Sequence, residues 1–227
     1  MKNIKYSILV FLFATVVLGS CNKMADQFDK KPSKNTSEVS VYPIFKMKGD
    51  VIMSISKGTA FSDPGVDVSE VIEGGTDLNA TMTIRGKVDA TTPGLYFLTY
   101  VAKNKYNYID SVKRTVLVYE GDLSLNPNIA GNYKGTITMG DMVVTASSIP
   151  GFWNTTNVNS KTVVIPATLA DIGGGKYVLV PGTYTDATGI GAYKGTAKLI
   201  VPATGNNQLE VSLTLANGTF VKLWKKQ

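Results

Sequence analysis

The chain has 227 residues and a formal net charge of +6, with 23 Lys and Arg against 17 Asp and Glu. It contains no histidine and a single cysteine, so Ser-His-Asp catalysis, Cys-His catalysis and the commonest zinc ligand sets are excluded. Its basic residues are spread along the chain instead of gathering on one element, which is untypical of nucleic-acid-binding proteins. An enzyme can work without histidine, for example with a pair of carboxylates.

Residues 1–21 have the parts of a bacterial secretory signal. Lys2 and Lys5 make a cationic start, residues 8–18 are almost entirely apolar, and Gly19-Ser20-Cys21 follows. The apolar run is shorter than the ~20 residues that cross a bilayer, so residues 1–20 are predicted to be a signal peptide. Small residues before the lone cysteine resemble a lipobox, which implies that Cys21 is lipidated after cleavage. An ordinary secretory signal followed by a chance cysteine is the alternative.

The rest of the chain divides into a tether and two β-rich parts. Residues 21–40 are polar and charged, which predicts a flexible tether. Short β-type runs separated by Gly, Pro, Asn and Asp then follow, and a boundary near Gly121 divides them into residues 41–120 and 122–227. The clearest predicted strands are residues 51–56, 82–88, 95–102, 112–119, 135–139, 142–146, 162–167, 176–180, 195–201, 209–215 and 219–224.

The predicted fold class is therefore all-β. Regular short strands with turn signals between them predict β-sandwiches or small barrels in both parts. Residues 95–101 carry apolar side chains on both faces, which predicts a central strand. Asn217-Gly218 predicts a hairpin with a type I′ turn.

Residues 42–119 contain the motifs Phe61-Ser62-Asp63-Pro64-Gly65, Pro93-Gly94-Leu95-Tyr96, Tyr100 and Arg114-Thr115-Val116. With these motifs, the segment resembles a bacterial surface immunoglobulin-like domain. The resemblance implies an immunoglobulin-like β-sandwich, followed by the second antiparallel β-sandwich or small barrel. It implies that Tyr96 forms a tyrosine corner, in which the hydroxyl bonds back to the backbone. Together with Cys21 and a second β domain, the whole chain resembles two-domain surface lipoproteins of Bacteroidota. That resemblance implies an outer-membrane location, on the surface or the periplasmic face, and contact with a nutrient transporter complex.

Phe152 and Trp153 are the candidate ligand-binding residues. They lie between Pro150-Gly151 and a polar Asn/Thr segment, in a stretch predicted to be a loop. Two large aromatics in such a loop either stack on a ligand, such as a sugar ring, or plug a barrel end. Two other groups are predicted to be structural. The acids Asp63, Asp67, Glu70, Glu73 and Asp77 are expected to cap turns. The lysines Lys222, Lys225 and Lys226 are expected to form a solvated C-terminal tail.

The function expected from these features is that of a lipid-anchored, non-enzymatic accessory or binding protein for glycan or peptide uptake. No catalytic residues, no metal ligands and no cofactor are predicted, and no nucleic-acid partner. Asp171, Asp186 and Glu210 are isolated acids in the second part of the chain. A carboxylate-based glycan-degrading enzyme is one alternative, and a purely structural or adhesin-like envelope protein is the other.

Overall fold

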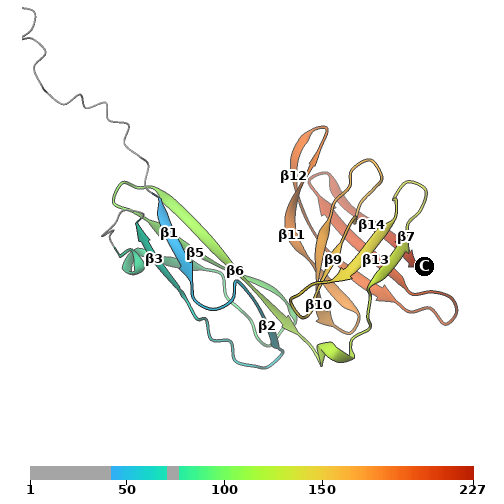
Figure 1. Ribbon diagram of the computed structural model, residues 1–227, viewed down its shortest axis with the longest axis horizontal. Coiled ribbons are helices and arrows are strands. Elements are labelled where there is room, and N and C mark those ends of the chain that lie inside the picture. The colour runs from blue at the N-terminus through green and yellow to red at the C-terminus, as the bar shows by residue number, and fades with distance from the viewer. Residues whose placement is uncertain (1–41, 71–76) are drawn as a thin grey trace, which may run out of the picture. The chain divides into compact units, whose positions relative to one another are not determined.

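The computed structural model describes residues 42–70 and 77–227, which fall within one compact unit, Val41–Gln227 (Figure 1). The described residues form fourteen β-strands and two 3₁₀ turns, Asn79–Thr81 and Leu123–Leu125, and no α-helix. Within these same ranges, no helix has the length and apolar character needed to cross a membrane. The predicted all-β class is therefore confirmed. The predicted signal peptide, tether and Cys21 lie outside the described residues.

The first part is a pair of small sheets. One contains β1 (Pro43–Met47) and β3 (Val66–Glu70), and the other has the order β2-β6-β5-β4. The bounds of the second sheet are β2 (Ile52–Ser56), β4 (Thr83–Arg85), β5 (Gly94–Lys103) and β6 (Ile109–Tyr119). Strand β5 lies between β4 and β6, so the predicted central strand is confirmed. The Tyr96 hydroxyl donates to the Thr92 carbonyl at 2.8 Å, which confirms the tyrosine corner.

The second part is a closed barrel of eight antiparallel strands. Its strands are β7 (Gly131–Lys134), β8 (Met142–Ala146), β9 (Phe152–Thr155), β10 (Ala167–Gly173), β11 (Lys176–Asp186), β12 (Gly189–Ile200), β13 (Gln208–Leu215) and β14 (Gly218–Lys226). Each strand pairs with the next in sequence, and β14 returns to β7. Of the two predicted alternatives, the structure shows the barrel, with an up-and-down order.

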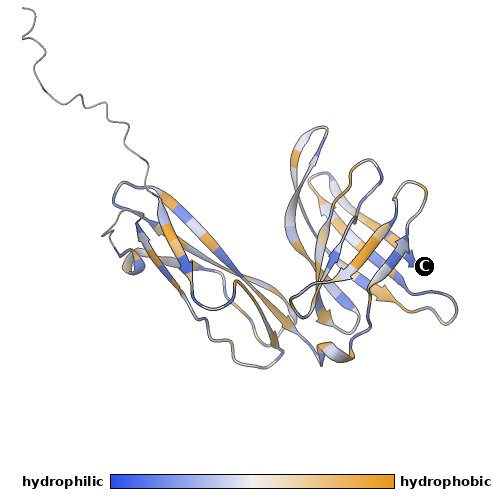
Figure 2. Ribbon diagram, in the orientation of Figure 1, coloured by the Kyte–Doolittle hydropathy of each residue, from blue (hydrophilic) through white to orange (hydrophobic). Residues whose placement is uncertain are grey.

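Side chains fill the interior of this barrel. Apolar and polar residues alternate along the strands (Figure 2), and the inward set is buried. Two interior aromatics donate to backbone carbonyls: the Tyr133 hydroxyl to Ile129 at 2.8 Å, and the Trp224 indole nitrogen to Gly140 at 3.3 Å. The buried Tyr177 hydroxyl has no hydrogen-bond partner among the described residues. An eight-stranded barrel is just wide enough to be filled in this way. A ligand is therefore expected at an end of the barrel and not at its centre.

Several predicted strand positions were wrong. Residues 135–139 and 162–167 lie mainly in the β7–β8 and β9–β10 connections, and the strands β1, β3, β7, β9 and β10 are not among those predicted. The Asn217-Gly218 hairpin exists, but Leu215 pairs with Gly218, so the two-residue turn is Ala216-Asn217. Asn217 is not among the residues with positive φ, as a type I′ turn at Asn217-Gly218 would require. The pairing of Leu215 with Gly218 therefore places the turn one residue earlier than predicted.

A separate apolar cluster lies outside the barrel wall. Leu117 of β6, Phe152 of β9 and Ala170 of β10 are buried in it. The backbone amide of Glu120 also donates to the Ile172 carbonyl at 3.1 Å. The predicted boundary near Gly121 thus lies beside packed apolar residues, and separate folding of the two parts stays a prediction.

Candidate functional site

One end of the barrel is shaped by four connections. They are the β7–β8 loop, the β9–β10 loop, the β11–β12 turn and the β13–β14 turn. From Gly182 to Tyr193, strands β11 and β12 pair only with each other, so this hairpin continues beyond its neighbours (Figure 1). We call this end the barrel mouth.

The β9–β10 loop, residues 156–166, packs into the barrel core at the mouth. Val158 and Ile165 are fully buried in the barrel core. Asn157 holds the loop in shape, since its side-chain amide donates to the carbonyls of Met139 at 3.2 Å and Ser160 at 3.1 Å. Its side-chain oxygen accepts from the backbone amides of Asn159 and Ile165. These four hydrogen bonds fix the conformation of the loop beside the barrel mouth.

A cavity of about 200 Å³ remains next to the loop. Its polar and aromatic lining comes from three connections and the strands beside them: Asn159, Tyr184, Asp186, Asn217, Phe220 and Lys222. Concave sites with an apolar wall and a few convergent polar groups are typical of small-ligand binding, and barrel mouths are common places for them. The cavity is the candidate site.

Lys222 is the cation of this cavity. Its side chain is partly buried, and its ammonium donates a hydrogen bond to the Asn159 side-chain oxygen. Burial lowers the pKa of Lys222, because desolvation disfavours the charged form. None of the ion pairs found among the described residues includes Lys222. A ligand oxygen would therefore meet a cation that no carboxylate neutralises.

An acid and two aromatics complete the lining. The Asp186 carboxylate accepts from the backbone amide and hydroxyl of Thr188, at 2.7 and 2.6 Å, and these bonds lower its pKa. The Tyr184 ring lies over Gly191, where a Cβ atom would come within 2.6 Å of the ring. Phe220 is 39% exposed. The cavity thus offers hydrogen-bond donors, acceptors and flat apolar faces together.

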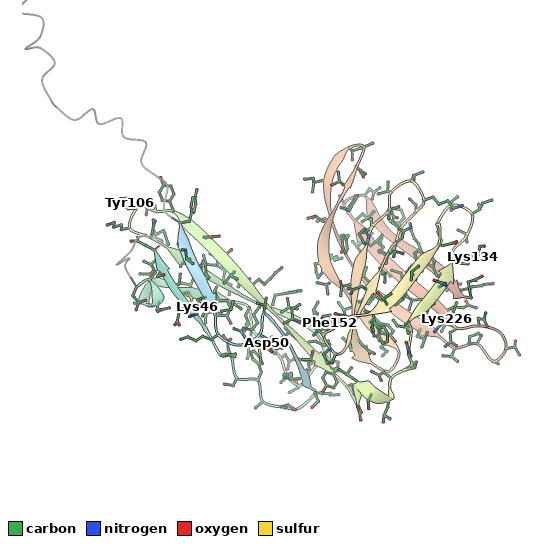
Figure 3. All side chains as sticks on the ribbon, viewed as in Figure 1. Lys46, Asp50, Tyr106, Lys134, Phe152 and Lys226 are labelled. Carbon is green, nitrogen blue, oxygen red and sulfur yellow. The ribbon has the colours of Figure 1, made fainter. Side chains whose placement is uncertain are left out.

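The predicted candidates, Phe152 and Trp153, lie in strand β9 and not in a loop. They pair with Ala170 and Leu169 of β10, which corrects the predicted loop. Phe152 is buried against Leu117 and Ala170 (Figure 3), whereas Trp153 is partly buried and packs against the barrel core. Neither residue lines the mouth cavity. Ligand binding by this pair stays a prediction.

The three lysines interpreted as a tail are instead parts of strand β14. Lys222 lines the mouth, Lys225 pairs with Lys134 of β7, and the Lys226 ammonium donates to the Asn128 carbonyl at 3.2 Å. The tail interpretation is therefore wrong, because β14 closes the barrel. No sequence signal separated Lys222 from its neighbours, and Asn159 had not been singled out.

The acidic residues have separate roles. Asp63 and Asp77 accept backbone amides two residues on, as predicted for turn caps. Asp67 and Glu70 lie in strand β3, so the turn-cap prediction is wrong for them. Asp67 pairs with Lys48 at 2.6 Å, and Glu70 is buried. Glu73 lies outside the described residues. In the barrel, Asp171 is buried, Asp186 lines the mouth and Glu210 pairs across the sheet with Lys198. Within the described ranges, no three His, Cys, Asp or Glu residues gather as a metal site would need.

An immunoglobulin-like domain followed by a closed, up-and-down eight-stranded barrel is the class of protein that the fold defines. Residues 45–118 match the model of the family described as bacterial surface protein, Ig-like domain, which confirms the predicted domain and indicates a cell-envelope location. Among solved structures, the chain is similar to a crystal structure of a lipoprotein from Bacteroides thetaiotaomicron. That match has 18% identity and a TM-score of 0.37, and covers 82% of this chain and 100% of the other. No curated protein matches the chain.

Proposed function

We propose that this protein is a lipid-anchored, non-enzymatic binding protein of the outer membrane that captures a glycan or peptide ligand at the barrel mouth. The immunoglobulin-like domain serves as spacer or docking module, and a nutrient transporter complex is the proposed partner. The observation that carries the proposal is the mouth cavity, in which Lys222, Asn159 and Asp186 stand beside Tyr184 and Phe220.

The composition of this cavity favours a small polar ligand with a flat face. Sugar rings and peptide groups both need donors and acceptors, which the lysine, amide and carboxylate side chains supply. Aromatic side chains supply apolar contact area at low cost in conformational entropy. A ligand that displaced the Asn159 contact would keep the Lys222 ammonium hydrogen-bonded. The site is thus suited to exchanging an internal hydrogen bond for a ligand bond.

Binding without catalysis is supported by the positions of the acids. Asp186 is engaged with Thr188, Asp171 is buried and accepts from Asn126, and Glu210 lies in β13, away from the mouth cavity's lining. A glycoside hydrolase of the common kind uses two carboxyl groups about 5–10 Å apart on either side of the bond. The mouth cavity has one carboxylate among the residues that line it.

The test is a binding screen on the full chain with an oligosaccharide array and a tetrapeptide library, followed by calorimetry on the best ligand. Lys222→Met and Tyr184→Ala should each weaken binding about tenfold or more. Tyr106→Ala, which removes an exposed tyrosine of the first part, should bind as the wild type does. Cleavage of a sugar during incubation would instead favour the glycan-degrading enzyme. Absence of binding in both panels would favour a structural or adhesin-like protein.

The lipid anchor is proposed at Cys21. Stable anchoring requires two or more acyl chains, and a lipobox cysteine receives them. Cys21→Ala should abolish acylation and leave either a precursor tethered through its uncleaved signal or a released soluble form. Mass spectrometry of the membrane and soluble fractions measures this. Normal acylation and sorting of the variant would contradict the anchor, whatever the result of the ligand screen.

A further inference from the structure

The outer wall of the barrel carries lysines in directly facing pairs. Lys176 of β11 lies opposite Lys198 of β12, and Lys225 of β14 lies opposite Lys134 of β7. All four side chains are exposed, and their strand neighbours Tyr177, Ala197, Trp224 and Tyr133 are buried inside the barrel. We call these four lysines the basic face.

Each of these pairs carries an electrostatic cost within the sheet. Like charges directly opposite each other destabilise a sheet. None of the four lysines takes part in an ion pair within 4 Å among the described residues. Glu210 lies opposite Lys198 and, on its other side, opposite Leu223. The residues opposite Lys176 are Gly173 and Lys198, and those opposite Lys225 are Gln208 and Lys134, so neither of these two lysines faces an acid.

A groove lies at one end of the basic face. It has a volume of about 410 Å³ and runs along the seam where β14 meets β7, the region of Lys134 and Lys226 in Figure 3. Lys134, Thr136, Lys225 and Gln227 supply donors to it, and Leu223 supplies an apolar wall. Carboxylate, sulfate and phosphate oxygens are the acceptors that such donors bind most strongly.

We infer that the basic face binds a polyanionic polysaccharide, with one anionic group of the chain seated in the seam groove. The two lysine pairs are separated by the β12–β13–β14 stretch of an eight-stranded barrel, so they point in different directions round a convex wall. A planar anionic bilayer cannot meet both pairs at once. A flexible polymer can follow the curve, which is why a polysaccharide fits this surface better than a membrane does.

The experiment measures binding of fluorescein-labelled dextran sulfate to the full chain, with neutral dextran as the blank. Lys134→Gln/Lys225→Gln and Lys176→Gln/Lys198→Gln should each weaken binding about tenfold at fixed salt and reduce its salt dependence. Lys87→Gln/Lys103→Gln removes the same charge from exposed positions in the first part and should leave binding within about twofold. Thermal melts should show that both barrel variants stay folded, because each removes a repulsion.

Two results would overturn the inference. An equal loss in the Lys87/Lys103 variant would mean that overall charge, and not the basic face, governs binding. Retention on phosphatidylglycerol vesicles without binding to dextran sulfate would mean that the surface recognises a membrane. Because this face is separate from the mouth, Lys222→Met should leave dextran sulfate binding unchanged, so the inference and the proposed ligand site fail independently.

Discussion

Arg114 joins the sequence motifs of the first part into one buried network. Its guanidinium is fully buried and donates to the carbonyls of Asp50, Lys48 and Gly65 at 2.8, 2.7 and 3.0 Å. It also lies 3.4 Å from the Asp63 carboxylate, which accepts the Tyr100 hydroxyl at 2.7 Å. Burial, followed by the bond to Asp63, raises the pKa of Tyr100. The motif residues are thus structural, since they satisfy one buried charge.

Arg114→Met should lower the free energy of unfolding by about 3–5 kcal/mol, because it leaves carbonyl groups and the Asp63 carboxylate without their donor. Arg85→Met, at an exposed position of β4, should change it by less than about 0.5 kcal/mol. Urea denaturation of both variants measures the difference. Equal stability of the two variants would mean that the network contributes nothing to the fold.

We expect Asp171 to make the stability of the barrel depend on pH. It is 2% exposed, and burial raises its pKa above the usual 3.8 despite bonds from Asn126 and Gly173. Because the folded state then holds the proton more tightly than the unfolded state, its contribution to stability increases as pH falls through the raised pKa. Wild type should therefore gain stability relative to Asp171→Asn between pH 7 and about pH 4.

The control for this comparison is Asp122→Asn. Bonds from Ser124 lower the pKa of Asp122, so wild type should lose stability relative to this variant on acidification. Unfolding curves at several pH values would show the opposite slopes. If the difference in unfolding free energy between wild type and Asp171→Asn did not change with pH, the Asp171 carboxylate would be solvated and not buried.

At the scale of elements, β9 shows why a short strand can look like a loop. It has four residues, follows Pro150-Gly151 and contains Asn154 and Thr155, so local propensity favours a turn. Pairing with β8 and β10 holds it extended. Phe152 then faces outward to Leu117, and Trp153 faces inward to the core.

Trp153→Ala tests whether this pair is structural or binds a ligand. Because Trp153 packs against the barrel core, we expect a loss of about 3 kcal/mol in stability. Val164→Ala, at a position 54% exposed in the β9–β10 loop, should have little effect. A thermal melt distinguishes the two roles, since an unchanged melting temperature together with weaker ligand binding would favour a ligand site at Trp153.

At the scale of the whole molecule, the separate folding of residues 38–121 and 122–227 can be tested directly. Each piece should unfold cooperatively, because each has its own sheets and buried cluster. The barrel piece should melt at a lower temperature than in the full chain, since Phe152 and Ala170 lose the cover of Leu117. Both tryptophans lie in the barrel piece, so their fluorescence reports on it alone. If neither piece folds, the chain is one continuous β domain.

The sequence by itself determined what depends on neighbours along the chain. Alternation placed β5 at the centre of its sheet, and the Pro93-Gly94 turn placed Tyr96 where its hydroxyl reaches Thr92. Period-two patterns are local, because successive side chains of any strand point to opposite faces.

Only the tertiary structure decided which groups meet across the barrel. The pairing of β14 with β7 joins residues about ninety positions apart, and it turns a presumed tail into the closing strand. Closure of the barrel also brings Asn159 of the β9–β10 loop within hydrogen-bond reach of Lys222 in β14. Two polar residues that no local pattern distinguishes thus line the mouth together. Closure of the sheet is a non-local event set by strand number and register, so no window of sequence contains it.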